Sequence, residues 1–142
     1  MELEGKIWKN KNHWLVEVSS LDIMTQGETR EEALFMIKDA ITEYLKYYFE
    51  CDLNEFNLTI NEYRKSVIGI TANNNNILLS LSLRRQREKS GSTIREASER
   101  LGSKSPNSYA QYEKGKTSFS LDQYEKLLQA ANPGNHRLLR VV

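Results

Sequence analysis

The sequence predicts an α+β domain followed by an all-α domain, and three observations support this. Residues 1–72 contain short segments in which apolar and polar residues alternate, around one long stretch with helical spacing. Residues 77–134 contain helix start and stop signals instead. The charge also changes: residues 1–72 carry 8 Lys and Arg against 13 Asp and Glu, a net −5, whereas residues 73–142 carry 12 against 6, a net +6. The two halves therefore differ in expected fold and in expected partner.

Alternating segments predict the first three strands. Apolar residues alternate with polar ones over residues 3–7 and again over residues 14–18. The Asn-Lys-Asn turn signal at residues 10–12 joins them, so we expect a β-hairpin. Residues 23–26 predict a third strand that ends at Gly27.

A single long helix is predicted to cover this sheet. The segment Thr29-Arg30-Glu31-Glu32 has the capping-box pattern, in which the Thr29 hydroxyl accepts from the N–H of Glu32 and the Glu32 carboxylate reaches back to Thr29. An apolar stripe follows at helical spacing, formed by Ala33, Leu34, Ile37, Ala40, Ile41, Tyr44, Leu45 and Tyr48. Residues 57–61 and 67–71 predict two more strands, which completes a small α+β domain.

Four consecutive asparagines at residues 73–76 mark the predicted linker. We accordingly divide the chain into a first domain at residues 1–72, a helical domain at residues 77–134 and a tail at residues 135–142. The strand-like pattern at the end of that tail predicts pairing across a dimer.

The second half predicts four helices, at residues 77–89, 93–101, 106–113 and 121–131. Ser105 is an expected N-cap, with Pro106 at the first helical position. Ser98 supplies a small residue where two helices cross, and Gly102 supplies a turn residue that tolerates positive φ. We expect Leu101, Tyr109 and Tyr112 to fill the space between these helices, which is the arrangement of a helix-turn-helix.

The helix at residues 106–113 is the predicted recognition helix. Asn107, Ser108 and Gln111 are its outward candidates, and Asn and Gln can pair bidentately with adenine. Residues at helix ends are expected to hold phosphates without reading sequence, namely Thr93, Lys104, Ser105, Lys114 and Lys116. The alternative is that a four-helix bundle does not touch DNA and that its Lys-rich ends are merely solvated.

The first domain shows no catalytic pattern. A metal-dependent nuclease needs several converging carboxylates, which Asp22 and Asp39 do not supply. His13 and His136 have no Cys or carboxylate at metal-ligand spacing, and the single Cys51 is interpreted as a packed or idle thiol. We therefore expect no enzyme activity, no cofactor and no metal site. The sequence has no apolar run of about 18 residues, so we expect no membrane span and, by default, a reducing cytoplasmic location.

The two tryptophans of the first domain receive different interpretations. Trp14 is expected in the core. Trp8 faces opposite Ile7 on its strand and is the better candidate for an interaction surface.

Three segments of the second half resemble the Xre/Cro-type repressor domain: Leu83-Arg84-Arg85-Gln86-Arg87-Glu88-Lys89-Ser90-Gly91, residues 97–102, and Tyr112-Glu113-Lys114-Gly115-Lys116. The resemblance implies that the helix ending in the Tyr-Glu-x-Gly pattern is the recognition helix. The turn Gly102-Ser103-Lys104-Ser105-Pro106 is one residue longer than the usual pattern. Which helix positions face the groove is therefore open by one residue.

A second resemblance covers nearly the whole chain. Gly5-Lys6-Ile7-Trp8, Trp14-Leu15-Val16-Glu17-Val18 and Met24-Thr25-Gln26-Gly27-Glu28-Thr29-Arg30-Glu31-Glu32-Ala33 resemble the N-terminal domain of HicB antitoxins. The segments Gly102-Ser103-Lys104-Ser105-Pro106-Asn107-Ser108-Tyr109 and Asn132-Pro133-Gly134 resemble the Xre-tailed branch of that family. Residues 50–65 match least.

This resemblance implies a partial, inactive RNase H-like domain that covers a HicA-type toxin, which is a small basic mRNA interferase. It also implies a homodimer or higher homo-oligomer whose second domain represses its own operon at palindromic operator DNA, with half-sites about 34 Å apart or a multiple of that. The acidic first half suits a basic partner. Two alternatives remain: a repressor whose first domain senses a small molecule, and an active nuclease.

Overall fold

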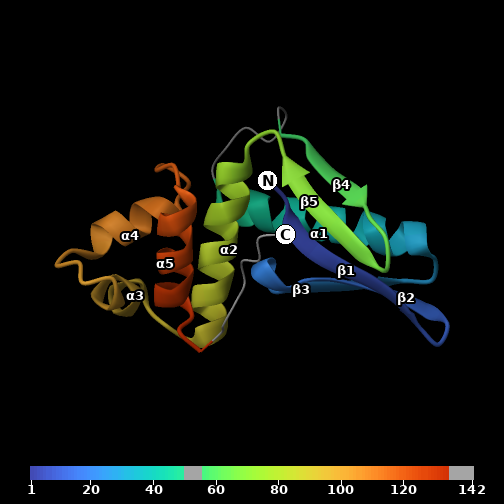
Figure 1. Cartoon of the computed structure of the whole chain (residues 1–142), viewed down its shortest axis with the longest axis horizontal. Helices are drawn as coiled ribbons and strands as arrows, with labels where there is room; N and C mark the ends of the chain where they lie inside the picture. The colour runs from blue at the N-terminus through green and yellow to red at the C-terminus, as the bar shows by residue number, and fades with distance from the viewer. Residues whose placement is uncertain (50–55, 135–142) are drawn as a thin grey trace. The chain divides into compact units, whose positions relative to one another are not determined.

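The structure of the chain, a computed structural model, describes residues 1–49 and 56–134 (Figure 1). It divides into two compact units, Met1–Asn75 and Asn76–Val142. The first combines an antiparallel sheet with one long helix and the second is all-helical, which confirms the predicted α+β class. Cys51, His136 and the predicted strand-like tail lie outside the described residues.

Five antiparallel strands form one sheet in the first unit, in the order β3-β2-β1-β5-β4. The strands are β1 (Leu3–Asn10), β2 (His13–Val18), β3 (Ile23–Gly27), β4 (Leu58–Glu62) and β5 (Val67–Ala72). The predicted hairpin is confirmed: β1 and β2 pair up to Asn10 and His13, and Lys11 in the turn has a φ of 56°.

The helix α1 (Arg30–Tyr48) packs on one face of this sheet (Figure 1). The strand before it, β3, and the strand after it, β4, lie at opposite edges of the sheet, so α1 connects the two edges across one face. Its buried residues are Ala33, Ile37, Ile41 and Leu45, all from the predicted stripe. They meet the strand residues that alternate onto the same face, which are Leu3, Ile7, Val16, Val18, Ile23, Leu58, Ile68 and Ile70.

At the start of α1, only half of the predicted capping box forms. Thr29 caps the helix as expected, with its Oγ1 accepting from the Glu32 N–H at 3.0 Å. The Glu32 carboxylate, however, accepts from the N–H of Glu28 at 3.2 Å rather than from that of Thr29. The reciprocal box forms instead at Thr93, where Glu96 N–H donates to Thr93 Oγ1 at 3.1 Å and Thr93 N–H donates to the Glu96 carboxylate at 3.2 Å.

Trp14 is also not where the sequence predicts it. Its side chain is half-buried, and the Arg30 guanidinium lies 6.0 Å from its ring centroid. Arg30 in turn pairs with Glu62 on β4. The expectation of a core position is wrong because an aromatic ring at the end of a strand can be covered by a cation from the helix start.

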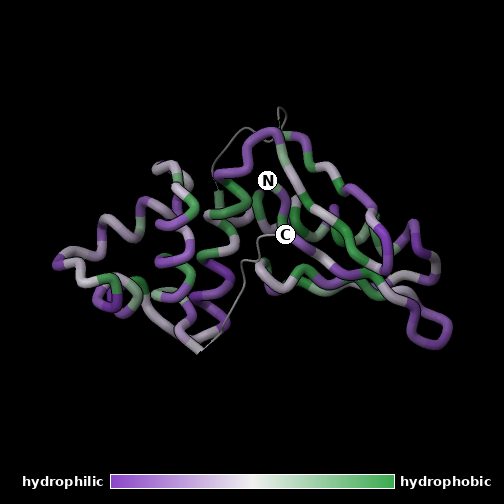
Figure 2. The backbone as a smooth tube through the Cα atoms, viewed as in Figure 1, coloured by the Kyte–Doolittle hydropathy of each residue, from purple (hydrophilic) through white to green (hydrophobic). Residues whose placement is uncertain are grey.

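The second unit contains α2 (Asn75–Ser90), α3 (Ile94–Arg100), α4 (Pro106–Glu113) and α5 (Leu121–Ala131). The helix α2 begins two residues before its predicted start, so part of the Asn run is helical. Figure 2 shows the first half of α2 hydrophobic and the second half hydrophilic. No helix within residues 1–49 and 56–134 is both long and apolar enough to cross a membrane.

Each of α2, α3 and α4 ends in the same hydrogen-bonded turn. At α3, the Ser103 N–H donates to Ser98 O at 3.1 Å and the Gly102 N–H donates to Glu99 O at 2.9 Å, with Gly102 at φ +77°. Gly91 and Gly115 occupy the same position after α2 and α4. This is the Schellman motif, in which a left-handed glycine lets the chain reverse and satisfies the last helix carbonyls.

The interior of the second unit is both apolar and hydrogen-bonded. Tyr109, Tyr124, Leu127 and Leu128 are buried. Polar links join the helices at several points: Ser82 with the Tyr124 hydroxyl, Asn132 Nδ2 donating to Gln86 Oε1 at 3.0 Å, Ser90 Oγ donating to Ala131 O at 2.7 Å, and Arg100 Nη1 donating to Ala130 O at 2.8 Å. Burial raises the pKa of Tyr124 to about 12, so this phenol stays neutral at physiological pH.

Candidate DNA-binding interface

The candidate recognition helix, α4, is fixed at both ends. Ser105 is its N-cap, accepting from the Asn107 N–H at 3.3 Å, and Pro106 follows at the first helical position, as predicted. At the other end, the Lys116 N–H donates to Gln111 O and the Gly115 N–H donates to Tyr112 O, both at 3.2 Å. A helix of eight residues is marginal alone, so these caps and its packing determine whether it forms.

The inner face of α4 carries Tyr109 and Glu113, which are four residues apart and both buried. Arg87 on α2 holds the Glu113 carboxylate in a two-point contact, with Nε to Oε2 at 2.6 Å and Nη2 to Oε1 at 3.0 Å. The third donor of Arg87, Nη1, reaches Ser92 O at 3.1 Å. This Arg87–Glu113 pair fixes α4 to α2 and to the start of α3 in one orientation.

Two side chains next to Glu113, those of Arg87 and Tyr109, have raised pKa values. Hydrogen bonding to Glu113 raises the pKa of Arg87 above its already high ordinary value. Burial, followed by the nearby Glu113 charge, raises the pKa of Tyr109 well above that of a free tyrosine. Arg87 therefore stays charged and Tyr109 stays neutral under all physiological conditions.

The outer face of α4 carries Asn107, Gln111 and Lys114. These positions are spaced by four and three residues, so they lie on one stripe opposite Tyr109 and Glu113. Asn107 and Lys114 are exposed and Gln111 is half-buried. The stripe thus presents two amides and one ammonium group, which are the donors that can meet base edges and a phosphate.

Ser105 and Ser108, the other two predicted DNA contacts at the start of α4, already take part in hydrogen bonds within the protein. Ser108 Oγ lies 3.2 Å from Ser103 Oγ, and Ser105 Oγ is the N-cap acceptor. Both hydroxyls point into the turn between α3 and α4 rather than lying on the outer stripe of Asn107. They order that turn, and each keeps a hydroxyl proton that can be redirected to a phosphate.

The turn between α3 and α4, at residues 102–106, is closed by serine side chains. Ser98 Oγ donates to Ser105 O at 2.8 Å, and Ser103 Oγ donates to the same carbonyl at 2.9 Å. Leu101, predicted to fill the space between the helices, is instead 36% exposed. The prediction for Leu101 is wrong because Gly102 reverses the chain directly after it, whereas buried Ser98 supplies the inward contact. Tyr109 is buried as predicted and Tyr112 is half-buried.

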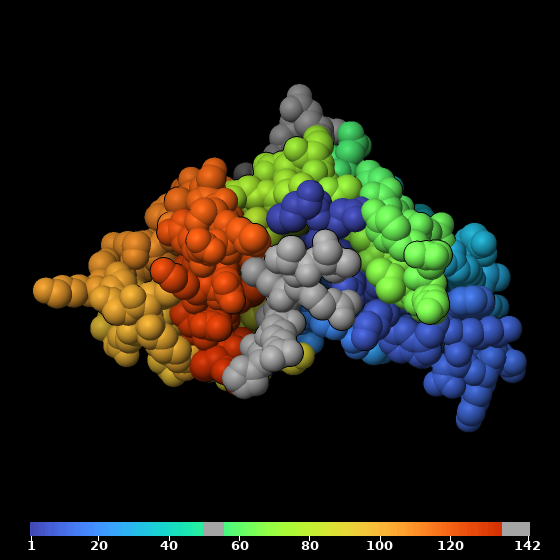
Figure 3. Space-filling view, in the orientation of Figure 1, coloured from blue at the N-terminus to red at the C-terminus, as the bar shows by residue number. Residues whose placement is uncertain are grey.

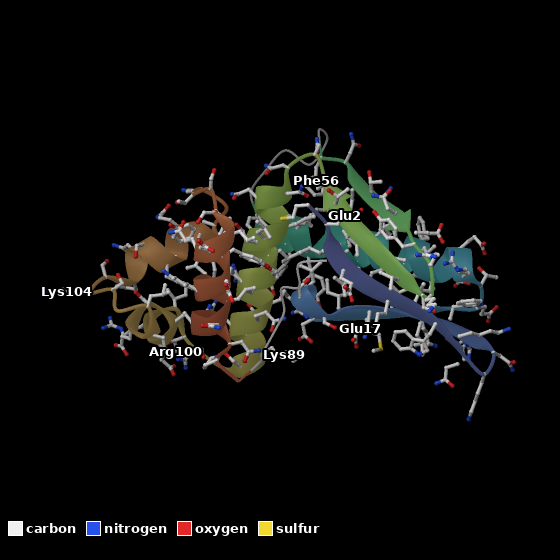
Figure 4. All side chains as sticks on the ribbon, in the orientation of Figure 1. Glu2, Glu17, Phe56, Lys89, Arg100 and Lys104 are labelled. Carbon is white, nitrogen blue, oxygen red and sulfur yellow. The ribbon has the colours of Figure 1, made fainter. Side chains whose placement is uncertain are left out.

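The predicted phosphate contacts come from three places around α4. Thr93 caps α3, Lys104 lies in the turn between α3 and α4, and Lys116 follows α4. Figure 4 labels Lys104 at the tip of that turn. Both lysines are exposed. The Thr93 hydroxyl already accepts from Glu96 and is available to an anion as a donor.

Arg95 is a candidate that the sequence analysis missed. It is an exposed cation in the first turn of α3, two positions after the Thr93 cap. Arg100, by contrast, donates to Ser92 Oγ and to Ala130 O, both at 2.8 Å, and so has a structural role. The signal that could have separated them was position, since Arg95 follows the N-cap of α3 whereas Arg100 is the last residue of that helix.

In the first unit, Trp8 is half-buried on the face of the sheet opposite α1, and His13 is exposed. Among residues 1–49 and 56–134, no group of three or more His, Cys, Asp and Glu side chains is placed to hold a metal ion.

Comparison with known proteins finds one family. Residues 83–132, about a third of the chain, match the helix-turn-helix family, and this span contains the second half of α2 and all of α3, α4 and α5. No curated protein and no solved structure matches the chain. The matched segment, with two helices joined by a reversed turn and a polar outer stripe on the second, is an Xre-type helix-turn-helix domain of the kind found in DNA-binding regulators.

Proposed function

We propose that this chain is a HicB-type antitoxin that also represses its own operon. The second unit binds operator DNA through α4, and the first unit binds and masks a small, basic, HicA-type mRNA interferase. The observation that carries the DNA-binding half is the outer stripe of Asn107, Gln111 and Lys114 on a helix whose inner face is held by the part-buried Arg87–Glu113 pair. A rigid helix with outward amides suits direct reading of bases in the major groove.

The charge of the second unit supports the same role. Residues 76–134 carry 10 Lys and Arg against 6 Asp and Glu, and the exposed cations include Lys104, Lys114 and Lys116 around α4. Counterion release from DNA then supplies affinity without sequence preference, and the stripe on α4 supplies the preference.

Two substitutions separate these contributions. Gln111→Ala is expected to weaken operator binding by about 1–3 kcal/mol and to relax the base preference at one position. Lys116→Ala is expected to weaken binding to all sequences alike and to reduce the salt slope of log K by about 1. Mobility-shift titrations over a range of salt, on operator and on scrambled DNA, measure both effects. Lys126→Ala, which removes an exposed cation from α5, is the matched control.

Binding by Gln111→Ala with unaltered affinity and unaltered base preference would contradict the assignment of α4 as the reading helix. A salt slope lowered equally by Lys126→Ala would show that the general charge of the unit matters rather than the cations around α4.

The antitoxin half of the proposal is supported by three segments of the first unit. The segments resembling HicB form β1, β2 and the β3–α1 junction, and the acidic balance of residues 1–72 suits a basic partner. This role requires a partner protein and no catalysis by the chain itself.

Co-expression tests this half directly. The probe is the product of a short, basic, His-containing reading frame next to this one. Expression of that product alone is expected to arrest growth, and expression of the present chain is expected to restore it. Continued arrest despite a soluble antitoxin candidate would refute the antitoxin role while leaving DNA binding untouched.

One observation favours the alternative of a ligand-responsive repressor. A surface pocket of about 540 Å³ lies against α1, lined by Ala40, Glu43, Tyr44, Tyr47 and Tyr48. The described part of its lining combines aromatic rings with the carboxylate of Glu43, which is the kind of lining that small-molecule sites use. A thermal shift with members of a metabolite panel, and none with the neighbouring gene product, would favour this second function.

A further inference from the structure

Within residues 1–49 and 56–75, no α-helix packs on the face of the sheet opposite α1. The antiparallel register puts Leu3, Ile7, Val16 and Val18 under α1 and turns the alternate residues to the opposite side. We call this opposite side the open sheet face; it carries Trp8, Leu15 and Met24 as an apolar cluster, with Glu4 and Glu17 beside them. Figure 1 shows α1 behind the strands, so this face is turned toward the viewer there and in Figure 3, which has the same orientation.

The centre of the open sheet face is apolar. Trp8 on β1 and Leu15 on β2 are direct cross-strand partners, and both are half-buried. Met24 on the neighbouring strand β3 is 54% exposed. An antiparallel sheet with one solvated face ordinarily carries polar residues there, so the fold does not require this apolar cluster. Large apolar side chains grouped on a surface, with a tryptophan among them, are typical of binding sites.

The surroundings of this cluster are acidic. Glu17 lies between Lys6 and Met24 in the cross-strand register, and Glu4 lies opposite Gly69. Farther along, Glu2 accepts from Asn61 Nδ2 and from the Tyr63 hydroxyl, each at 2.6 Å. These hydrogen bonds lower the pKa of Glu2, so its carboxylate is held ionised. Figure 4 labels Glu2 and Glu17 on this face.

The carboxylates of the open sheet face outnumber its cations. Among the described residues that the register turns to this side, there are three carboxylates, Glu2, Glu4 and Glu17, and one lysine, Lys6. A nucleic acid is disfavoured here because its phosphates would meet these carboxylates. A second copy of the chain is disfavoured because a two-fold contact would place the same acidic rim against itself.

We propose that the open sheet face is the docking surface for a basic protein partner, with Trp8 as its central anchor and the carboxylates of Glu4 and Glu17 meeting Lys or Arg side chains. This inference rests on the proposed antitoxin function and names the surface that performs it. The apolar centre supplies affinity, and the acidic rim supplies orientation and speed of association.

Variants of the full-length chain test this surface. The probe is the purified product of the neighbouring reading frame, titrated by calorimetry. Trp8→Ala and Met24→Lys are each expected to weaken binding at least about tenfold, in line with a central anchor. Glu17→Lys is expected to slow association, with a smaller effect at high salt. Phe35→Ala, which removes an aromatic side chain that is 66% exposed on α1, is the matched control and is expected to bind within about twofold of the wild type.

A second readout separates docking from folding. Each variant is expected to retain operator binding, since that resides in the second unit, and Met24→Lys changes an exposed side chain and so leaves the core intact. If Trp8→Ala and Met24→Lys both bind the partner with wild-type affinity while Phe35→Ala binds more weakly, the docking surface lies on α1. That result would overturn this inference but leave the proposed antitoxin function intact. Failure of the wild-type chain to bind would overturn the proposed function as well. Altered sedimentation of the sheet-face variants by themselves would show that a second copy occupies the face, which also overturns the inference.

Discussion

Glu113→Ala is expected to lower the free energy of unfolding of the second unit by about 3–5 kcal/mol. The substitution leaves the Arg87 guanidinium, which is only 13% exposed, without the carboxylate that holds two of its nitrogens. The loss is costly because the part-buried guanidinium keeps its Nη1 contact with Ser92 O but loses the partner of its two other nitrogens. Urea denaturation followed by circular dichroism measures the effect.

An exposed ion pair provides the control. Arg84 and Glu88 on α2 form a contact of 3.2 Å at i, i+4 spacing, with about a third of each side chain exposed. Arg84→Ala is expected to cost less than about 1 kcal/mol, because exposed pairs contribute little. The double variant Arg87→Met with Glu113→Leu is expected to recover most of the stability, since an apolar pair can replace a buried salt bridge. An equally large loss in the double variant would show that packing around Glu113, rather than its charge, is responsible.

The same substitution should affect DNA binding through geometry. The Arg87–Glu113 pair anchors the last turn of α4, and Gln111 and Lys114 flank Glu113 on the outer side. Loosening this anchor leaves the outer side chains present but less well positioned, so affinity should fall more on operator DNA than on scrambled DNA. This difference would distinguish misplacement of the helix from simple loss of folded protein.

Gly27→Ala is expected to destabilise the first unit by about 1–3 kcal/mol or more. A Cβ at this position would lie 2.6 Å from the backbone nitrogen of Ala33 and 3.0 Å from the carbonyl carbon of Glu32. These are backbone atoms of the first turn of α1, so the clash cannot be relieved by a side-chain rotation. The end of β3 and the start of α1 must move apart, which also strains the Thr25 Oγ1 bond to Ala33 O at 3.2 Å.

Thermal unfolding monitored by circular dichroism tests this prediction. Gly134→Ala is the matched control, because the nearest atom to its added Cβ lies at 4.0 Å. That variant is expected to change stability by less than about 0.5 kcal/mol. A Gly27→Ala variant as stable as the control would show that the approach of β3 to α1 is looser than the structure indicates.

The sequence predicted most of the fold because its local signals agree with its tertiary packing. The stripe of α1, the hairpin at residues 10–12, the Ser105 cap and the reversal at Gly102 all depend on neighbours within a few residues. The order of the strands, with β5 inserted between β1 and β4, depends on contacts about 60 residues apart and has no local signature.

For the candidate site, the sequence predicted which side of α4 each residue occupies but not which distant residues it contacts. Helical spacing alone puts Asn107 and Gln111 on one side and Tyr109 and Glu113 on the other. The partner of Glu113 was not predictable, because Arg87 lies 26 residues earlier among three other cationic residues of α2. The exposure of Leu101 was likewise hidden, since an apolar residue before a turn has the same sequence pattern whether it faces inward or outward.

The central place of β1 in the sheet has a consequence for the order in which the protein can fold as it is synthesised. The strand can pair with β2 as soon as the hairpin emerges, but its other edge stays unpaired until β5, about 60 residues later, has left the ribosome. Loop closure over that distance is slow compared with helix formation, and an unpaired edge attracts other chains and proteases in the meantime. A nascent chain that stops before β5 would therefore present an incomplete sheet, in which one edge of β1 is open to other chains and to proteases.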